Sequence, residues 1–456
     1  MIVKQCYMRI VSVFLTMLLL LGMSVPVSAA DYTAQDTDVD LSVSAAGVYE
    51  NWDGVSNVCQ FLDAKGEMCL AYVKGKTVSV IRTKKGKKTG KTIKLKMPYS
   101  EFGGVACDAK GNYYVVSGTQ NKGQDSSKKT IYITKYSKSG KKVKSVGNCG
   151  DASLTAYWSG EFRTRTPFFG GNCDVAVNGK YLCVHYAREM YSGHQSNSMF
   201  VIDTQTMKKV SAGVFYQSHS FAQRVVPYKN DFILASEGDC YERAFTVCET
   251  NIASGQCVVQ PVFDFWVEKG ALDRYDMYQV NNNRAHMGGV AVGKNNLVAF
   301  CATSVKALSK QAKKQSEELY IQIFDPEKNL ADAASYKTKG ERSGVAGNNG
   351  TRTVTNHGVK WLTKYGKNYS VENPQIVATA SGRFVVLFER SHKGKYEGVF
   401  YLVVNADGKV VKKIAKISGK AKLNPCRMPV YANGKVMWAA NNNGGKDLYI
   451  HSFSVE

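Results

Sequence analysis

The stretch VACDAKGNYYVV (residues 105–116) has the form that decides the fold: an apolar strand, a tight turn closed by glycine, and a second apolar strand. The same form recurs in VCQFLDAKGEMCLAY (58–72), CDVAVNGKYLCV (173–184), VVPYKNDFILA (225–235), VAVGKNNLVAF (290–300), IVATASGRFVVLF (376–388) and VYANGKVMWA (430–439). One such hairpin cannot bury both of its faces. A series of them therefore indicates a stacked or ring-shaped array.

Two further strand-like segments follow most of these hairpins. After 105–116 they are 131–136 and 141–146, and the turn between them carries Gly140. Four-strand units with period-two alternation and glycine-bearing turns are typical of the blades of a β-propeller. The sequence therefore predicts an all-β protein, a propeller of seven four-stranded blades, with six or eight blades also compatible with the repeats.

The last unit, from Val430 to Phe453, contains only three strands before the chain ends. A closed ring must borrow the missing strand, because an open sheet edge would invite aggregation. Residues 39–44 (Val39 to Ser44) alternate suitably and are predicted to complete the last blade. On this interpretation residues 31–38 are a flexible leader and the propeller spans 39–456.

Residues 1–30 have the organisation of an export signal. Lys4 and Arg9 precede an apolar run from Ile10 to Leu21, and small residues at 27–30 form a cleavage site. No later segment has the length and apolarity of a transmembrane helix. We expect a secreted protein, released or held non-covalently at a cell surface, and acting as a monomer.

The chain is strongly basic, with 60 Lys and Arg against 37 Asp and Glu. Such a charge favours anionic partners, for example wall polymers. The lysines crowd segments 84–88, 139–144 and 409–413, which resemble turns and outer edge strands. Lysine on an edge strand prevents edge-to-edge pairing, and this interpretation is preferred to a dedicated polyanion site. No nucleic acid partner is expected.

Twelve cysteines occur, and eleven remain once Cys6 is removed with the signal. Most lie in apolar strands, where cysteine serves as a small buried hydrophobe. Cys248 and Cys257 flank a tight loop and could face each other, but disulfide connectivity cannot be deduced from spacing. Because the spacings do not match zinc ligation, neither a metal nor a cofactor is predicted.

The predicted loops are unequal on the two faces of the ring. First-to-second and third-to-fourth turns share one face and are tight, whereas second-to-third and inter-blade loops share the other face and carry the irregular sequence, including 148–172, 263–287 and 332–373. Long loops on one face of a rigid scaffold usually hold the functional site. The predicted ligand-binding residues are Tyr191, His194, Gln195, Asn197, His219, Gln223, Asp239, Tyr241, Arg243 and His286. Of these, His219, Gln223 and His286 are expected nearest the channel mouth.

Segments 190–197 and 218–223, together with Gly238, Asp239 and Tyr241, resemble a group of exported bacterial propeller proteins of uncharacterised function. The resemblance covers mainly residues 170–245. It implies a propeller fold and an exported, surface-associated role, and it brings no catalytic residue.

Imidazole, amide, acid and guanidinium groups beside aromatic rings suit a small ligand or a glycan. The sequence thus favours an exported binding protein for an extracellular glycan or peptide. The alternative is a glycan hydrolase or lyase, with acid and base groups drawn from His194, His219, His286, Asp239 and Glu389. A third reading is a structural wall protein retained by its charge. Whether the chain is an enzyme stays open at this level.

Overall fold

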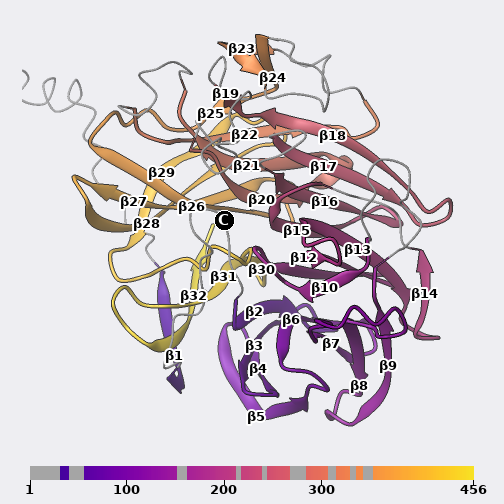
Figure 1. Ribbon diagram of the computed structural model, residues 1–456. Coiled ribbons are helices and arrows are strands. Elements are labelled where there is room, and N and C mark those ends of the chain that lie inside the picture. Colours follow the sequence, from indigo (N-terminus) through magenta and orange to yellow (C-terminus); the bar gives the residue numbers. More distant parts are fainter. Residues whose placement is uncertain are drawn as a thin grey trace, which may run out of the picture.

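The computed structural model describes residues 31–40, 56–150, 162–211, 217–238, 244–267, 284–306, 315–328, 335–342 and 353–455. It is all-β, and seven antiparallel sheets follow one another around a ring (Figure 1). The predicted signal peptide, 1–30, lies outside the described residues. Among the described residues no helix has the length and hydropathy needed to span a membrane.

Each blade is a meander whose first strand lies innermost. Blade 1 contains β2 (Val58–Leu62), β3 (Met68–Lys74), β4 (Thr77–Lys84) and β5 (Lys87–Lys96). Blade 2 contains β6 (Glu101–Cys107), β7 (Tyr113–Gly118), β8 (Ile131–Tyr136) and β9 (Lys142–Asn148). Blade 3 contains β11 (Cys173–Asn178), β12 (Tyr181–Met190), β13 (Gln195–Asp203) and β14 (Lys208–Ser211), and β10 (Thr164–Pro167) also pairs with β12. Blade 4 contains β15 (Ser220–Tyr228), β16 (Asp231–Gly238), β17 (Ala244–Asn251) and β18 (Gln256–Asp264).

The ring continues through three more sheets. Blade 5 contains β20 (His286–Val292), β21 (Val298–Ser304), β22 (Glu318–Phe324) and β25 (Lys360–Trp361), and the turn η2 (Lys294–Asn296) joins its first two strands. Blade 6 contains β26 (Tyr369–Ala378), β27 (Phe384–His392), β28 (Lys395–Val404) and β29 (Val410–Ser418). Blade 7 contains β30 (Val430–Ala432), β31 (Lys435–Asn441), β32 (Asp447–Ser454) and β1 (Thr33–Asp40). The predicted seven-bladed propeller, closed by an N-terminal strand, is confirmed.

The alternating sequence of each inner strand buries both faces of a blade. In β7, Tyr113 and Val115 pack into a cluster with blade 1, whereas Tyr114 and Val116 pack into a cluster with blade 3. Successive side chains of a strand point to opposite faces, so one strand contributes to two cores. The hydrophobic core is therefore divided among the blade interfaces.

A short sequence pattern, Asp-x-x-Gly, specifies hairpin turns between the first two strands of a blade. In blade 1 the Asp63 carboxylate accepts the backbone N–H groups of Lys65 and Glu67, at 2.8 and 3.0 Å. Gly66 then adopts a φ of 74°, a left-handed conformation that glycine reaches without steric cost. The Asp-x-x-Gly pattern thus fixes both the turn and the register of the two strands.

The closing strand lies earlier in the chain than predicted. β1 covers Thr33–Asp40, so the segment expected to be a leader forms most of it, and residues 41–44 lie outside the described residues. The Thr37 hydroxyl donates to the Leu448 carbonyl at 2.7 Å, and Val39 is buried in the blade 7 core. Thr37 and Val39 thus bury two side chains at alternate positions of β1. These contacts explain why Thr33–Asp40 forms the closing strand although it contains few apolar residues.

Blade 5 also corrects one predicted loop. The segment 332–373 was expected to join two blades, but Lys360 and Trp361 in β25 pair with Ile321 and Tyr320 as the fourth strand of blade 5. The connection from β22 to β25 is thus a third-to-fourth connection. It carries β23 (Ser335–Arg342) and β24 (Thr353–His357), which form a small sheet with β19 (Trp266–Val267).

Candidate functional site

We call the face of the ring at which the innermost strands begin the long-loop face. It carries His194, His219 and His286. His194 ends the β12–β13 turn, His219 precedes β15, and His286 begins β20. Asp239, Tyr241 and Arg243 lie outside the described residues. The remaining predicted residues fall into a histidine pair, a buried support network, and His286, which lies apart from both.

His194 and His219 form the histidine pair. Their ring centroids are 4.8 Å apart, and His194 Nε2 lies 2.6 Å from the Ser218 Oγ. Burial, followed by the positive potential of His219, lowers the pKa of His194 to about 4. His194 is therefore neutral at neutral pH. A neutral imidazole bonded to a serine resembles a base–nucleophile pair, but Ser218 is only 3 % exposed, so its hydroxyl does not face a substrate in this conformation.

Four predicted ligand-binding residues are buried and bonded to the protein itself. The Tyr191 hydroxyl donates to the Asp125 carbonyl at 2.9 Å, and Gln195 Nε2 donates to the carbonyls of Phe169 and Ser220. Asn197 Oδ1 accepts the Gln217 N–H at 2.7 Å, and Gln223 exchanges two hydrogen bonds with Asn172. These hydrogen bonds hold the loops in place. The role of the four side chains in ligand binding stays a prediction.

His286 lies one blade further round the ring. It is half-buried, and its pKa is lowered by burial, against the raising effect of Glu372 and with a smaller lowering effect of Arg284. Its charged neighbours thus belong to blades 5 and 6. The histidines expected to share one pocket are divided between two regions of the same face.

A pocket of about 590 Å³ opens between blades 5 and 6 on this face. Three separate segments form it: the entry to β20, the entry to β22 and the entry to β26. Its lining residues are Arg284, Gln315, Ser316, Glu317, Lys367, Tyr369 and Ser370. None of these lining residues was among the ligand-binding residues predicted from the sequence. The missed signal is that charged residues immediately precede successive strands on the same face.

The polar groups of this pocket are held in place. Arg284 Nε lies 3.1 Å from Glu317 Oε1, and its guanidinium also donates to the Gln315 carbonyl. Burial raises the pKa of Glu317, although Arg284 opposes the shift. The Ser370 hydroxyl donates to Glu372 Oε1 at 2.5 Å. The result is a partly buried carboxylate beside the Arg284 guanidinium, in a pocket that Lys367 also lines.

Tyr369 is fixed by a stack of rings and a guanidinium. Its ring lies 4.4 Å from the His392 ring at an interplanar angle of 15°. The Arg390 guanidinium lies 4.9 Å from the Tyr365 ring and 4.0 Å from the Phe400 ring, and its Nε bonds Glu397 at 2.5 Å. Cation–π contacts of this kind rigidify the wall that carries Tyr369. The pocket therefore has an aromatic side with little freedom to move.

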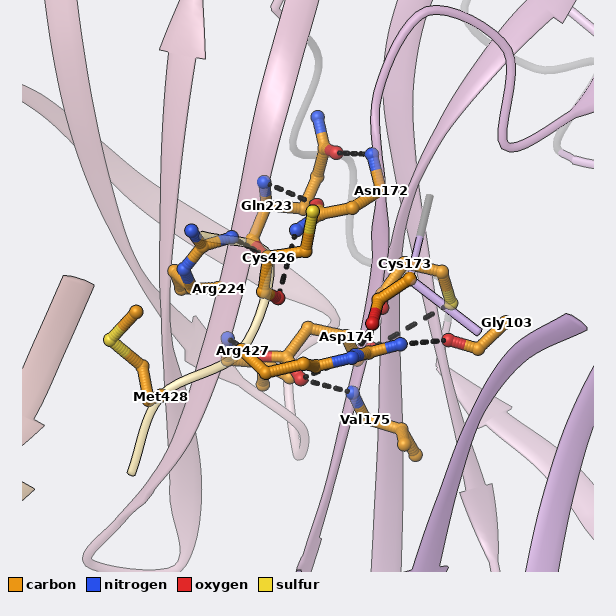
Figure 2. A network of polar contacts seen from close by, with 12 residues as sticks. Gly103, Asn172, Cys173, Asp174, Val175, Gln223, Arg224, Cys426, Arg427 and Met428 are labelled. Atoms are coloured by element: carbon orange, nitrogen blue, oxygen red, sulfur yellow. Dashed lines mark hydrogen bonds and ion pairs between the residues drawn. The ribbon is translucent and has the colours of Figure 1, made fainter. Parts of the chain in front are cut away.

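The channel mouth on the long-loop face is occupied by the chain itself. We call residues 421–429, between β29 and β30, the axial strap. Figure 2 shows Arg427 of the strap donating to the carbonyls of Gly103 and Cys173, at 2.9 and 2.7 Å, with Asp174 at 3.4 Å. The Arg224 guanidinium donates to the Pro425 carbonyl at 2.8 Å. A ligand on this face therefore meets the strap at the channel mouth.

Glu389, one of the acid groups considered for catalysis, anchors this strap. Its Oε1 accepts the Leu423 N–H at 2.7 Å, and its Oε2 lies 2.8 Å from Lys422 Nζ and 3.1 Å from Asn373 Nδ2. Only 1 % of Glu389 is exposed. Its contacts are those of a structural carboxylate.

The other half of the channel holds a cavity of about 510 Å³. The inner strands β2, β6, β11 and β15 form its walls, together with the tight turns that follow β2, β6 and β11. Arg427 and Asp174 also line it. Within the described part of the chain, no group of three or more His, Cys, Asp or Glu side chains could hold a metal ion. The cavity opens toward the face opposite the histidines.

Comparisons with known proteins assign no family and no activity to this chain. No protein-family model matches the chain, and no curated protein matches it. A protein of unknown function from Dyadobacter fermentans matches at 10 % identity and a TM-score of 0.37, over 81 % of this chain and 98 % of that one. The Dos1 propeller matches at 9 % identity and 0.39, over 86 % and 76 %.

A polysaccharide lyase of the PL25 ulvan lyase family matches at 12 % identity and a TM-score of 0.37, over 75 % of this chain and 82 % of that one. These similarities are too distant to transfer an activity. The function must be argued from the site.

Proposed function

We propose that this propeller is an exported binding protein that recognises an acidic glycan in the pocket between blades 5 and 6. One observation carries the proposal: Arg284, Glu317, Lys367 and Tyr369 reach this pocket from three separate entry segments. Loops of neighbouring blades that converge on one concavity are a usual way for a rigid scaffold to present a binding site.

The chemistry of the pocket fits a charged sugar better than an apolar ligand. The Arg284 guanidinium and the Lys367 ammonium supply donors for a carboxylate. Glu317 and Gln315 supply acceptors for hydroxyl groups, and the Tyr369 ring offers an apolar surface to a sugar ring. A peptide with an acidic side chain is the competing ligand, and it lacks the row of hydroxyl groups that Gln315 and Glu317 would satisfy.

An enzymatic role is a second candidate, because the pKa of Glu317 is raised by burial. A raised pKa favours the protonated form of a carboxyl group, which is the form that acts as a general acid. Glu372 is an electrostatic neighbour of Glu317 and provides a second carboxylate. Cleavage of a glycan would require both groups to flank one scissile bond.

Export is supported by the basic, apolar and small-residue segments of the first thirty residues. Export would place the pocket where extracellular and cell-surface glycans are available. The test of this step is the N-terminal sequence of the protein recovered from the culture medium of its native cells.

Binding can be tested on a panel of oligosaccharides that contain uronic acids, their neutral counterparts, and acidic peptides. Affinity is then measured by calorimetry for the best probe. We expect Tyr369→Ala and Arg284→Gln to weaken binding at least about 10-fold, which corresponds to ~1.4 kcal/mol. Product analysis with Glu317→Gln separates binding from cleavage, because the amide of this variant keeps an acceptor oxygen for hydroxyl groups but cannot transfer a proton.

A matched control is Tyr99→Ala, since the Tyr99 ring lies 4.3 Å from the Tyr132 ring of blade 2, far from the pocket in the ring. This variant should bind as the unmodified protein does. Equal losses in Tyr99→Ala and Tyr369→Ala, or a preference for acidic peptides over every glycan, would contradict the proposal.

A further inference from the structure

Lysines are concentrated on the outer strands of three consecutive blades. Seven lie in residues 84–96 of blade 1, four lie in 138–144 of blade 2, and two lie at 208–209 of blade 3. All of these residues are exposed, and Lys88 lies 3.4 Å from the Asp38 carboxylate of β1. The segments 84–96, 138–148 and 206–211 contain no acidic residue, arginine or aromatic residue. We call these lysines the basic arc.

The arc is continuous in space as well as in blade order. A Cβ placed on Gly140, in the turn between β8 and β9, would lie 3.4 Å from the Lys94 carbonyl of β5. The Lys144 Nζ of β9 donates to the Thr206 carbonyl at 3.0 Å, in the turn before β14. Each outer strand thus contacts the turn of the next blade. Figure 1 shows β5, β9 and β14 succeeding one another along the rim.

Protection of sheet edges does not explain this concentration. Proline or a few charges suffice to protect an edge strand. In blade 4, β18 carries Pro261 and no lysine, and in blade 7 β1 carries Asp36, Asp38 and Asp40 instead. Some outer strands are therefore protected without lysine. The basic arc carries more positive charge than protection of the sheet edges requires.

We propose that the basic arc binds a flexible linear polyphosphodiester chain that has no nucleobases. Lysine ammonium groups bind phosphate as point charges, and thirteen of them along a rim offer a series of equivalent sites. The surface is independent of the pocket between blades 5 and 6. Its failure to bind would leave the proposed glycan recognition intact.

The shape and composition of the arc select this partner over other polyanions. The rim is convex, so a flat membrane would touch it along one line only. Duplex DNA has a persistence length of about 50 nm and does not follow a rim of this size. Single-stranded nucleic acid is usually held by aromatic side chains that stack on bases, and the three segments contain none.

The experiment measures binding of full-length mature protein to lipid-free poly(glycerol phosphate) over a range of salt concentrations. Vesicles of anionic phospholipid, duplex DNA and single-stranded DNA are the competing probes. The arc variant carries Lys91→Glu, Lys94→Glu, Lys141→Glu and Lys142→Glu. We expect it to bind poly(glycerol phosphate) at least about 10-fold more weakly and with a shallower dependence on salt, because fewer counterions are released.

The matched control carries the same change of formal charge on blade 6. Its substitutions are Lys409→Glu, Lys412→Glu, Lys413→Glu and Lys420→Glu, all at exposed positions. It should lose no more than about 2-fold, as expected for a long-range effect that salt screens. Circular dichroism confirms that both variants fold. Equal losses in the two variants would overturn the proposal, as would tighter binding to vesicles or to either DNA.

Discussion

Two fully buried histidines, His185 and His451, should make the stability of the ring depend on pH. The His185 Nδ1 donates to the Arg224 carbonyl at 3.2 Å, and its Nε2 accepts from Asn197 Nδ2 at 3.1 Å. A second proton on Nε2 would face the Asn197 amide hydrogens. Burial lowers the pKa of His185 to about 3 and that of His451 to about 4.

The sign follows from the protons bound in each state. In the unfolded chain these imidazoles regain the ordinary pKa of about 6.5, so below that pH the unfolded state binds more protons than the folded state. Their contribution to stability is present above pH 6.5 and is lost as the pH falls toward the folded pKa. Each histidine therefore lowers the free energy of unfolding by about 2 kcal/mol between pH 7.5 and pH 5.

Carboxyl groups whose pKa is raised in the folded state have the opposite effect, because their contribution to stability increases as the pH falls. Glu317 and Glu389 are two of them, so the overall slope mixes several groups. A comparison of variants removes this difficulty. We expect the stability difference between the unmodified protein and His185→Gln, measured by urea denaturation, to shrink by about 2 kcal/mol from pH 7.5 to pH 5.

His451→Gln provides a second, independent measurement. Its ring accepts from the Tyr32 hydroxyl at 2.9 Å and stacks on Trp438. His392→Gln is the control, because His392 is only half-buried. A difference that stays constant with pH in both buried-site variants would refute the reasoning.

Three further results are expected. Deletion of residues 31–40 removes β1 and should lower the thermal midpoint by many degrees, which calorimetry would detect; an unchanged midpoint would exclude β1 as the closing strand. Arg427→Met leaves the Asp174 carboxylate without its cationic partner and two buried carbonyls without the guanidinium donor, so the free energy of unfolding should fall by about 3 kcal/mol in urea; a smaller loss than in Lys435→Met, which breaks a more exposed ion pair with Asp31, would contradict this. His286→Ala should weaken ligand capture with little change in melting temperature, because His286 is an electrostatic neighbour of Arg284 at the pocket, whereas His219→Ala should leave capture unchanged; loss of the fold before loss of binding would count against a role of His286 in the site.

The blades could be predicted from the sequence because their signals are local. In β7 and its neighbours, alternating apolar residues and an Asp-x-x-Gly turn specify a strand pair without reference to the rest of the chain. The closing strand was predicted from the same alternation but was placed too late. The correct segment, Thr33–Asp40, has few apolar residues, and it is selected by contacts such as that of Thr37 with Leu448.

The candidate site was less predictable because it depends on distant residues. The pairing of His194 with His219 follows from the topology of adjacent blades, and the sequence located both side chains on the same face. The pocket around Glu317 and Tyr369 combines segments whose approach no local pattern reveals. The axial strap was missed for the same reason, since its partners come from the other blades.

The axial strap has a consequence for the order in which the chain can fold. Its Met428 carbonyl accepts from Gln60 across 368 residues, and its Asn424 amide donates to Ser56 across the same interval. Contacts between residues so far apart form late, because their loops must first be closed. During synthesis from the N-terminus, blades 1 to 6 would exist for some time as an incomplete ring. Its inner edges stay unfilled until the last few dozen residues are available, which makes that interval the one in which a chaperone would be most needed.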